Sequence, residues 1–248
     1  MKRLFDICVA AVALVVLSPV LLIAAIGVRL TSPGPILYRA QRMARDRRRG
    51  ASGALAIVTS DRRSPDGYRG REFVMYKFRT MRVATGNGGP PITAANDSRI
   101  SPFGAFLRAT KIDELPQLVN VLKGEMSLVG PRPEEPDIVR RYYQPDDLET
   151  LQVRPGLTSP GTIYYYAHCE AMLSADSLMD RYLQRLMPLK LALDRVYVER
   201  ASLLYDIRLI WRTLVAILAR ISRTAEYPET PELADVPPDR WLTGSSGS

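Results

Sequence analysis

Two adjacent carboxylates with basic residues on both sides are the groups in this chain best suited to chemistry on a phosphate. Asp113 and Glu114 stand between Arg108 and Lys111 on one side and Arg132 on the other. Cationic side chains and the free backbone amides of a helix start both attract phosphate oxygens. The pattern indicates a site that holds a phosphate against a carboxylate, although a purely structural acidic turn with basic neighbours would have the same sequence.

A short helix is predicted to carry this acidic pair. Its apolar residues follow the i, i+3, i+4, i+7 spacing of a buried helix face; they are Leu115, Leu118, Val119 and Leu122. Gly124 is a normal helix stop, and Pro116 lacks an amide hydrogen, which a helix tolerates only near its start. The pair is therefore expected in the first helical turn, where free backbone amides attract anions.

The amino terminus contains a long apolar run. No charged residue occurs from Ile7 to Val28, and at about 1.5 Å per residue this run is long enough to cross a hydrocarbon core of roughly 30 Å. Ser18 and Pro19 lie in its middle, where proline removes a backbone hydrogen bond and clashes with the preceding turn. A membrane helix with a kink at these two residues is expected.

Basic residues flank the apolar run on both sides, namely Lys2, Arg3, Arg29, Arg39 and Arg42. A spanning helix usually has its positive flank only on the cytoplasmic side. A bent helix over residues 1–30 that enters and leaves the same leaflet is therefore preferred to a straight span. A cleaved signal peptide fits less well, because the run is too long and no small-x-small cleavage site precedes Arg29.

Composition agrees with a protein that works at a membrane surface in a reducing compartment. The 248 residues suit one domain plus appendages, and the net charge of +8 favours anionic partners such as lipid or nucleotides. No nucleic-acid-binding motif is recognised. Cys8 and Cys169 are far apart in sequence and suggest neither a disulfide framework nor a CxxC metal site.

The remaining pattern predicts an α+β fold that is mostly helical. The segments SPGPILYRAQR and EFVMYKFRTMR predict a small β-hairpin. Residues 43–71 between them are rich in Arg, Gly and Ser, and they are expected to form a mobile, solvated loop rather than a lipid-binding finger. Helices are expected over residues 99–123, 134–143 and 173–200, so that residues 31–225 form one membrane-associated domain.

The last predicted helix, residues 203–221, is amphipathic. It places Arg208, Arg212 and Arg220 on one stripe and apolar residues elsewhere, which is typical of a helix at a membrane interface. A buried helix of a helical bundle with one solvent-exposed edge would have a similar pattern. Residues 226–248 are proline-rich and acidic and end in GSSGS, so they are predicted to be a flexible tail with a linker remnant at its end.

Several motifs occur in an order that resembles the bacterial sugar transferase family, the monotopic polyprenol-phosphate phosphoglycosyl transferases. They are KRLFDI, the apolar run broken at Ser18 and Pro19, SPGPILYRAQR, YKFRTM, RATKIDELPQLVNVLKGEMSLVGPRPE and VRPGLT. The resemblance covers about residues 2–158 and, more loosely, the helix at residues 205–213. Because several motifs recur in the same order, the match is specific.

The resemblance implies an enzyme of the inner membrane with its catalytic domain on the cytoplasmic face. Such an enzyme transfers a phosphosugar from a UDP-sugar to polyprenol (undecaprenyl) phosphate and releases UMP. This is the first membrane step in making a surface glycan, such as an exopolysaccharide, capsule, O-antigen or glycoprotein glycan. Magnesium is the implied cofactor, and an oligomer is compatible with this reading.

The resemblance also assigns site residues. Asp113 is the expected nucleophile, and Glu114 is its partner, which accepts a proton or, with Asp113, holds the magnesium ion. Arg108 and Arg132 are expected to neutralise phosphate charge. Lys77 and Arg79 lie in the YKFRTM motif and are further phosphate-binding candidates, with a purely structural role as the alternative.

The sequence departs from the family pattern in three places. The glycine that usually follows the QxR segment is absent, and the hairpin loop is longer than usual. The GxxQVxGR run that often follows PGLT is replaced by SPGTIYYYAHCE, so an arginine implied in nucleotide or phosphate binding has no match. Arg154 or the tyrosines at 164–166 are candidate substitutes.

Two rival functions remain compatible with the sequence. The first is a membrane-anchored scaffold without catalytic activity, which would not require an acidic pair beside arginines and prolines. The second is a glycosyltransferase that moves the sugar without its phosphate. The nucleotide product separates the two enzymes, because the phosphoglycosyl transferase releases UMP and the glycosyltransferase releases UDP.

Overall fold

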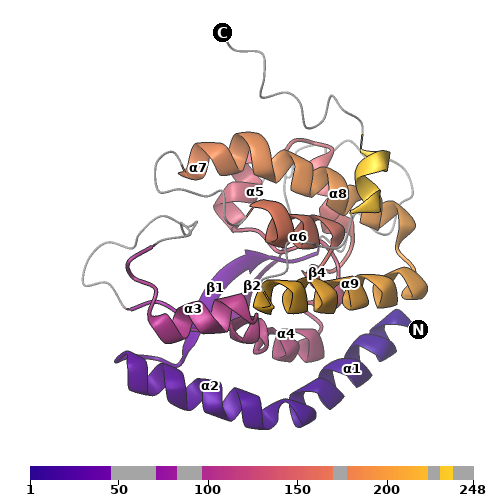
Figure 1. Ribbon diagram of the computed structural model, residues 1–248. Coiled ribbons are helices and arrows are strands. Elements are labelled where there is room, and N and C mark those ends of the chain that lie inside the picture. Colours follow the sequence, from indigo (N-terminus) through magenta and orange to yellow (C-terminus); the bar gives the residue numbers. More distant parts are fainter. Residues whose placement is uncertain (46–70, 83–96, 170–177, 223–229, 237–248) are drawn as a thin grey trace.

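The protein is mostly helical, as predicted. A computed structural model describes residues 1–45, 71–82, 97–169, 178–222 and 230–236 (Figure 1). The α-helices are α1 (Lys2–Val16), α2 (Ser18–Thr31), α3 (Pro102–Ala109), α4 (Gln117–Lys123), α5 (Pro136–Tyr142), α6 (Pro160–Tyr164), α7 (Leu178–Arg181), α8 (Met187–Arg200) and α9 (Leu203–Ile221). The strands are β1 (Leu37–Met43), β2 (Glu72–Phe78), β3 (Ser127–Val129) and β4 (Gly156–Thr158). Short 3-10 helices are η2 (Ile112–Glu114), η3 (Asp147–Gln152) and η7 (Pro231–Asp235), and single π turns are η4 (Tyr165–Cys169) and η6 (Tyr182–Leu186).

The apolar run forms two helices that are bent at the predicted break. The axes of α1 and α2 differ by 63°. Pro19 lies in the first turn of α2, and the Ser18 hydroxyl donates a hydrogen bond of 2.7 Å to the carbonyl of Val15. Among the described residues, no single helix is long and apolar enough to cross a membrane, and only this bent pair reaches that length. Figure 1 shows the pair along one side of the molecule, opposite α7 and α8.

The start of α1 is tied to the rest of the protein by buried charged groups. The Lys2 ammonium donates to Asp206 of α9 at 2.5 Å, and the Tyr197 hydroxyl of α8 donates to the same carboxylate at 2.7 Å. Asp6, which is fully buried, accepts a hydrogen bond of 2.8 Å from the Ser127 hydroxyl of β3. A buried carboxylate is stable only with such partners. The first turns of α1 are therefore an integral part of the folded domain.

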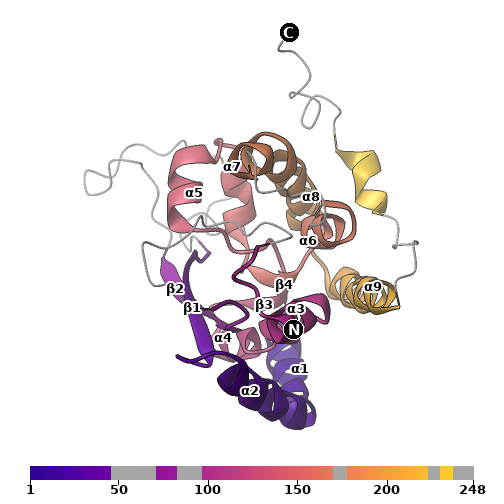
Figure 2. The same ribbon diagram turned by 60° about the vertical axis from the view of Figure 1, so that its left-hand side comes forward.

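Two small sheets organise the centre of the molecule. The predicted hairpin is confirmed, with β1 and β2 antiparallel and Leu37 opposite Phe78. The parallel pair of β3 and β4 was not predicted, because strands of three residues carry no recognisable alternation. Figure 2 shows this pair at the centre. It is closely packed, since a Cβ added to Gly156 would lie 2.2 Å from the backbone nitrogen of Gly130.

The acidic pair lies outside the first turn of α4, contrary to the prediction. Asp113 and Glu114 form η2, and α4 begins at Gln117. The reason is Pro116, which has no N–H with which to continue an α-helical ladder from the preceding turn. Instead the amide of Leu115 bonds to the carbonyl of Ile112 at 3.2 Å, as in a 3-10 helix.

The buried face of α4 also differs from the predicted one. Leu118 is buried as expected, but Val119 and Leu122 are exposed. Asn120 is fully buried instead, because its side chain bonds to the backbone of β2 at Val74 and Tyr76. A polar residue therefore occupies the packed face, which the apolar spacing alone does not indicate.

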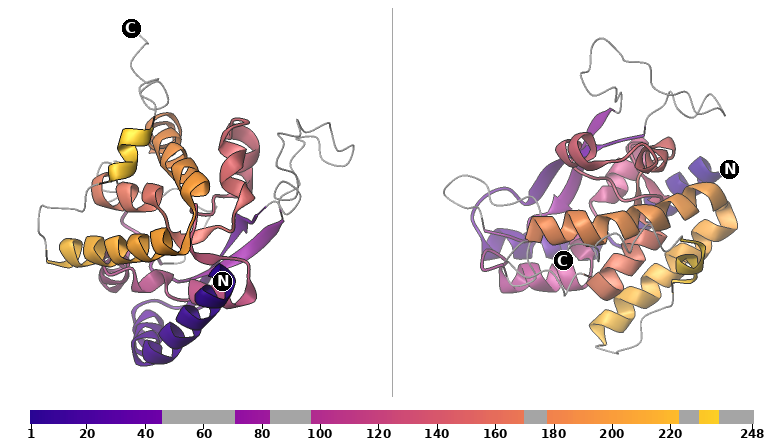
Figure 3. Two further views of the ribbon diagram at one scale, coloured as in Figure 1. Left: turned by 90° about the vertical axis from the view of Figure 1, so that its right-hand side faces the viewer. Right: turned by 90° about the horizontal axis from the view of Figure 1, so that it is seen from above.

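Residues 230–236 pack against α8 and α9, so this part of the predicted flexible tail 226–248 is structured, whereas residues 226–229 and 237–248 lie outside the described residues. Glu232 of η7 is buried and accepts hydrogen bonds from Tyr205 at 2.7 Å and from Arg212 at 2.6 Å. Val236 is buried against α8. Figure 3 shows η7, in yellow, beside these helices. Most of the expected loop at 43–71 and the GSSGS ending lie outside the described residues.

Helix α9 spans the residues predicted for the last helix. Most of its exposed surface is apolar. The exposed apolar residues of α9 are Leu204, Ile207, Trp211, Leu214, Leu218 and Ile221. Arg212 pairs with Glu232, and Arg220 packs against Tyr166, whereas Arg208 is exposed. The arginines therefore do not act together as one solvent-facing stripe.

Candidate active site

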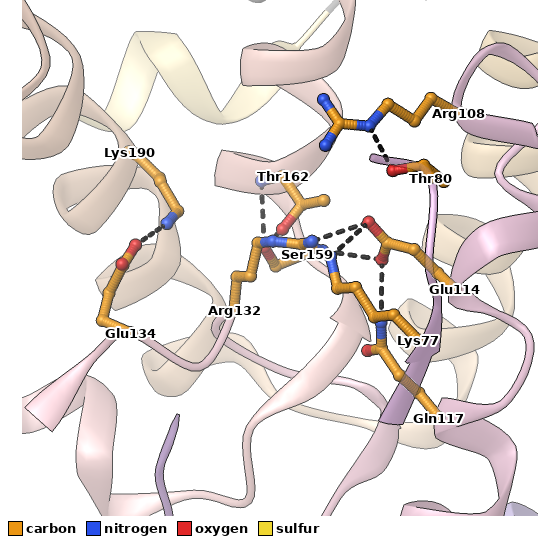
Figure 4. Close-up of polar contacts among 10 residues, drawn as sticks. All are labelled: Lys77, Thr80, Arg108, Glu114, Gln117, Arg132, Glu134, Ser159, Thr162 and Lys190. Carbon is orange, nitrogen blue, oxygen red and sulfur yellow. Dashed lines mark hydrogen bonds and ion pairs between the residues drawn. The ribbon is translucent and has the colours of Figure 1, made fainter. Parts of the chain in front are cut away.

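Glu114 is held by two cations. Arg132 makes a bidentate contact, with Nη2 donating to Oε1 at 2.6 Å and Nη1 donating to Oε2 at 2.9 Å. The Lys77 ammonium donates to Oε1 at 3.2 Å, and the Gln117 amide donates to Oε2 at 3.3 Å (Figure 4). We call Glu114, Arg132 and Lys77 the Glu114 cluster. Because bidentate arginine contacts fix both position and orientation, the Glu114 carboxylate is immobilised.

The members of this cluster come from three different parts of the fold. Lys77 is near the end of β2, Glu114 is in η2, and Arg132 follows β3 in an extended segment between two prolines. The segment is held by β4, since the Gly156 amide bonds to the carbonyl of Pro131 at 2.9 Å. The hairpin and the parallel pair thus supply the two cations independently.

Asp113 is buried beside this cluster, and one of its carboxylate oxygens has no hydrogen-bond partner among the described residues. Its side chain is 7% exposed, and its Oδ1 has no hydrogen-bond partner among the described residues. Burial and the negative charge of Glu114 raise the pKa of Asp113, while the charges of Lys77, Lys111 and Arg108 act in the opposite direction. A buried carboxylate oxygen without a partner is costly and requires an explanation. Asp113 also lines a cavity, so a substrate or a metal ion could supply the partner that this oxygen lacks.

The two carboxylates therefore differ in their ionisation. Burial opposes the charged form of Glu114, but Arg132 and Lys77 outweigh it and hold the pKa of Glu114 well below its ordinary value. Burial in turn lowers the pKa of Lys77 to about 8, although the charge of Glu114 favours its protonation. Groups whose environments separate their pKa values are typical of sites with divided roles. Glu114 is therefore held as an anion, whereas the ionisation of Asp113 depends on opposing contributions from burial and from nearby charges.

The other predicted phosphate-binding residues are placed differently. Arg108 lines the same cavity, and its Nε donates to the Thr80 hydroxyl at 2.8 Å. Both terminal nitrogens of Arg79 donate to backbone carbonyls after α2, at Ser32 and Pro33, each at 2.6 Å. This supports the structural alternative for Arg79. Arg154 donates to the carbonyl of Gly124 and is not among the residues that line the cavity.

A cavity of about 1520 Å³ surrounds the acidic pair. One wall is polar and includes Lys77, Arg108, Lys111 and Arg132, and another is apolar and is formed by α9 through Ile210, Leu214 and Ile217. Small-molecule pockets have volumes of about 300–1000 Å³. The volume and the two kinds of wall suit a phosphorylated ligand together with an apolar one.

A second buried polar group lines this cavity and was missed from the sequence. Glu134 accepts a hydrogen bond of 2.5 Å from the Tyr182 hydroxyl and forms an ion pair with Lys190. Figure 4 shows Arg132 directed to Glu114 and Glu134 directed to Lys190, on the other side of the same segment. No spacing rule joins residues 134, 182 and 190, so only the fold reveals their contact.

The residues of the site offer a magnesium ion one carboxylate oxygen that has no other partner in the described part of the chain. Among the described residues, no group of three or more His, Cys, Asp or Glu side chains gathers at one place. Magnesium is commonly bound through one or two carboxylates together with substrate phosphates. Both oxygens of Glu114 already accept from cations, whereas Oδ1 of Asp113 is open. The residues fit a magnesium ion that the substrate itself helps to bind.

Comparison with known proteins decides the family. The pattern described as bacterial sugar transferase matches residues 1–50 and 53–220. The chain belongs to this family. The match extends beyond Thr158, where the recognisable motifs end, so the altered segment and α9 are part of the family domain.

Curated relatives in this family have related names. The chain is 35% identical over 222 residues, 88% of its length and 39% of the relative's, to a UDP-glucose:undecaprenyl-phosphate glucose-1-phosphate transferase of Xanthomonas campestris pv. campestris. A protein of the same name from Caulobacter vibrioides is 33% identical, with 88% of this chain and 69% of the relative covered. The exopolysaccharide production protein PSS of Rhizobium leguminosarum bv. phaseoli is 33% identical, with 89% and 96% covered. The chain thus spans well under half of the Xanthomonas relative.

Loss of Arg132 should destabilise the fold more than loss of an exposed arginine. Arg132→Ala leaves the buried Glu114 paired only with Lys77, and we expect the free energy of unfolding to fall by about 2 to 3 kcal/mol. Arg140→Ala is the matched control, because its ion pair with Glu72 is exposed and should contribute at most about 1 kcal/mol. Chemical unfolding in detergent measures both. Equal losses in the two variants would show that the Glu114 cluster is not a major structural contact.

Proposed function

We propose that this protein transfers a phosphosugar from a UDP-sugar to polyprenol phosphate and releases UMP. The proposal rests on Oδ1 of Asp113, which is buried without a hydrogen-bond partner from the described residues beside a Glu114 that two cations hold in place. Support comes also from the family and from relatives named as undecaprenyl-phosphate sugar phosphotransferases. The product is the first membrane-bound intermediate in the synthesis of a surface glycan.

The reaction has two displacement steps at the same phosphorus atom. In the first step, Oδ1 of Asp113 bonds to the sugar-linked phosphorus of the UDP-sugar, and the bond to the bridging oxygen breaks so that UMP leaves. In the second step, a phosphate oxygen of the polyprenol phosphate attacks that phosphorus, and the Asp113 carboxylate leaves. Arg108, Arg132 and Lys77 stabilise the charge on the phosphoryl oxygens. Glu114 orients Arg132 and Lys77 for this task.

Magnesium is the proposed cofactor, and Asp113 and Glu114 are the carboxylates of the protein that would hold it. When bound, the ion would neutralise diphosphate oxygens and assist the departure of UMP. Because Glu114 already accepts from Arg132 and Lys77, Asp113 is the stronger candidate for direct contact, through the carboxylate oxygen that does not attack phosphorus. The remaining ligands would come from the diphosphate and from water.

We further propose that α1 and α2 form a re-entrant element in the inner membrane and that the domain lies on the cytoplasmic face. The ion pair between the Lys2 ammonium and Asp206 of α9 supports an amino terminus on the same side of the membrane as the domain. The outer surface of the pair is apolar and exposed, for example at Val15, Leu22 and Ile26. A kink at Pro19 then returns the chain to the leaflet from which it entered.

Replacing the nucleophile should abolish UMP release without unfolding the protein. Asp113→Asn keeps the size of the side chain but cannot attack phosphorus, and we expect UMP release to fall at least about 1000-fold. The assay uses purified protein in detergent with magnesium, undecaprenyl phosphate, and either UDP-glucose or UDP-N-acetylgalactosamine. Full activity in this variant would refute the assignment of Asp113.

The same assay with wild-type protein distinguishes the rival functions. UMP as product is expected, release of UDP would identify a sugar transferase that leaves the phosphate behind, and no nucleotide product would favour a scaffold. Asp137→Asn is a matched control, because it makes the same change at an exposed position of α5.

The topology predicts that the amino terminus is inaccessible from outside the cell. Lys2 pairs with Asp206 and is best left unchanged, so a cysteine is added before Met1 in a protein that lacks Cys8 and Cys169. A membrane-impermeant thiol reagent should label this cysteine only after the cells are permeabilised. Labelling of intact cells would mean that the apolar run crosses the membrane.

A further inference from the structure

Two cations that are distant in sequence lie against one tyrosine ring at the edge of the cavity. The Lys111 ammonium is 4.3 Å and the Arg220 guanidinium carbon is 4.6 Å from the ring centroid of Tyr166. The Tyr166 hydroxyl donates to the carbonyl of Ala109 at 2.8 Å, which fixes the ring. We call these three side chains, Lys111, Tyr166 and Arg220, the Tyr166 stack.

Lys111 connects the Tyr166 stack to the acidic pair. It lies two residues before Asp113 and is the only non-glycine residue with a positive φ, 57°, in the described chain. Lys111 and Asp113 line the same cavity. Strained backbone of this kind concentrates at functional sites. The Lys111 ammonium lies over the Tyr166 ring, two residues before the acidic pair in the chain.

Arg220 connects the stack to the apolar wall. It follows the residues of α9 that line the cavity, including Leu214 and Ile217. Leu214 lines the cavity and is also 50% exposed, so the cavity reaches the outer surface at α9. Trp211 and Leu218 are exposed on the same helix. An apolar chain that follows α9 into the cavity therefore passes close to the stack.

These cations are separate from those that hold Glu114. Lys77 and Arg132 make direct contacts with Glu114, and they come from the hairpin and from the segment after β3. Lys111 and Tyr166 line the cavity, and Arg220, near the end of α9, contacts the same Tyr166 ring next to the apolar wall. The Glu114 cluster and the Tyr166 stack are thus two separate cationic groups at one cavity, and the second lies next to the apolar residues of α9.

We propose that Lys111 and Arg220, held by Tyr166, bind the phosphate of the polyprenol phosphate where it enters the cavity along α9. They position a phosphate oxygen for attack on the phosphosugar carried by Asp113. The isoprenoid chain lies along the apolar surface of α9, and the donor diphosphate is bound by Lys77, Arg108 and Arg132. This inference rests on the proposed function and assigns the acceptor to particular residues.

The two half-reactions test this assignment. Exchange of labelled UMP into the UDP-sugar without polyprenol phosphate reports only the step at Asp113. Transfer at varied undecaprenyl phosphate reports the KM of the acceptor. Both are measured in nonionic detergent, so that no anionic lipid surface attracts Arg220. For Arg220→Gln we expect the acceptor KM to rise about 10-fold, the effect of losing one charge-assisted hydrogen bond, with UMP exchange nearly unchanged.

Two further variants separate binding from a structural role. Arg220→Lys keeps a cation and should recover most of the acceptor KM. Lys111→Asn removes the other charge with a residue that tolerates the left-handed conformation, and it should raise the same KM. Arg141→Gln is the control, because it removes a positive charge from an exposed position of α5 and should leave both half-reactions as in wild type.

The outcomes distinguish this inference from the proposed function. If Arg220→Gln and Lys111→Asn leave the acceptor KM unchanged, or if UMP exchange and transfer fall together, the Tyr166 stack has a structural role and the inference is wrong. The proposed function would still stand in either case. If wild-type protein gives neither UMP exchange nor UMP release with UDP-glucose or UDP-N-acetylgalactosamine, both the proposed function and the inference fail for these donors.

Discussion

The ion pair between Glu114 and Arg132 is the contact on which the site depends. It requires the parallel pair of β3 and β4, because these strands hold the proline-flanked segment that carries Arg132. Lys77 reaches the same carboxylate from the hairpin. Burial raises the pKa of Asp113, and the negative charge of Glu114, which the cations hold as an anion, raises it further. Glu114 thus has a structural role, whereas Asp113 retains an oxygen, without a partner among the described residues, that can take part in the reaction.

Buried charges also set the position of the site relative to the apolar helices. Asp206 accepts from Lys2 and from Tyr197, so α1, α8 and α9 meet at one carboxylate. Asp6 connects α1 to β3 in the same way. Because β3 leads directly to Arg132, the apolar helix pair and the acidic pair are parts of one packed structure. In the proposed re-entrant arrangement, this connection would hold the site at the depth of the lipid headgroups, which suits a reaction between a water-soluble nucleotide sugar and a lipid phosphate.

The sequence predicted local features better than those that depend on distant contacts. The break at Pro19, the hairpin and the extent of the last helix follow from local patterns and are found in the structure. The buried face of α4 was wrong, because Asn120 bonds to a strand that spacing rules do not consider. The contact of Arg220 with Tyr166 could not be predicted, since no local rule joins residues 54 positions apart. Residue types and spacing identified the acidic pair and the resemblance assigned its roles, but only the fold shows how differently its two members are held.

The most direct test of the central claim is intact-protein mass spectrometry after incubation with UDP-sugar and magnesium but no polyprenol phosphate. The account predicts a burst of at most about one UMP per active site and a mass gain of one phosphosugar, located on Asp113 and absent in Asp113→Asn. The opposite result is UMP release only when both substrates are present, with no adduct even after rapid quenching. That would indicate direct displacement in a ternary complex, with Asp113 as a metal ligand or base rather than the nucleophile.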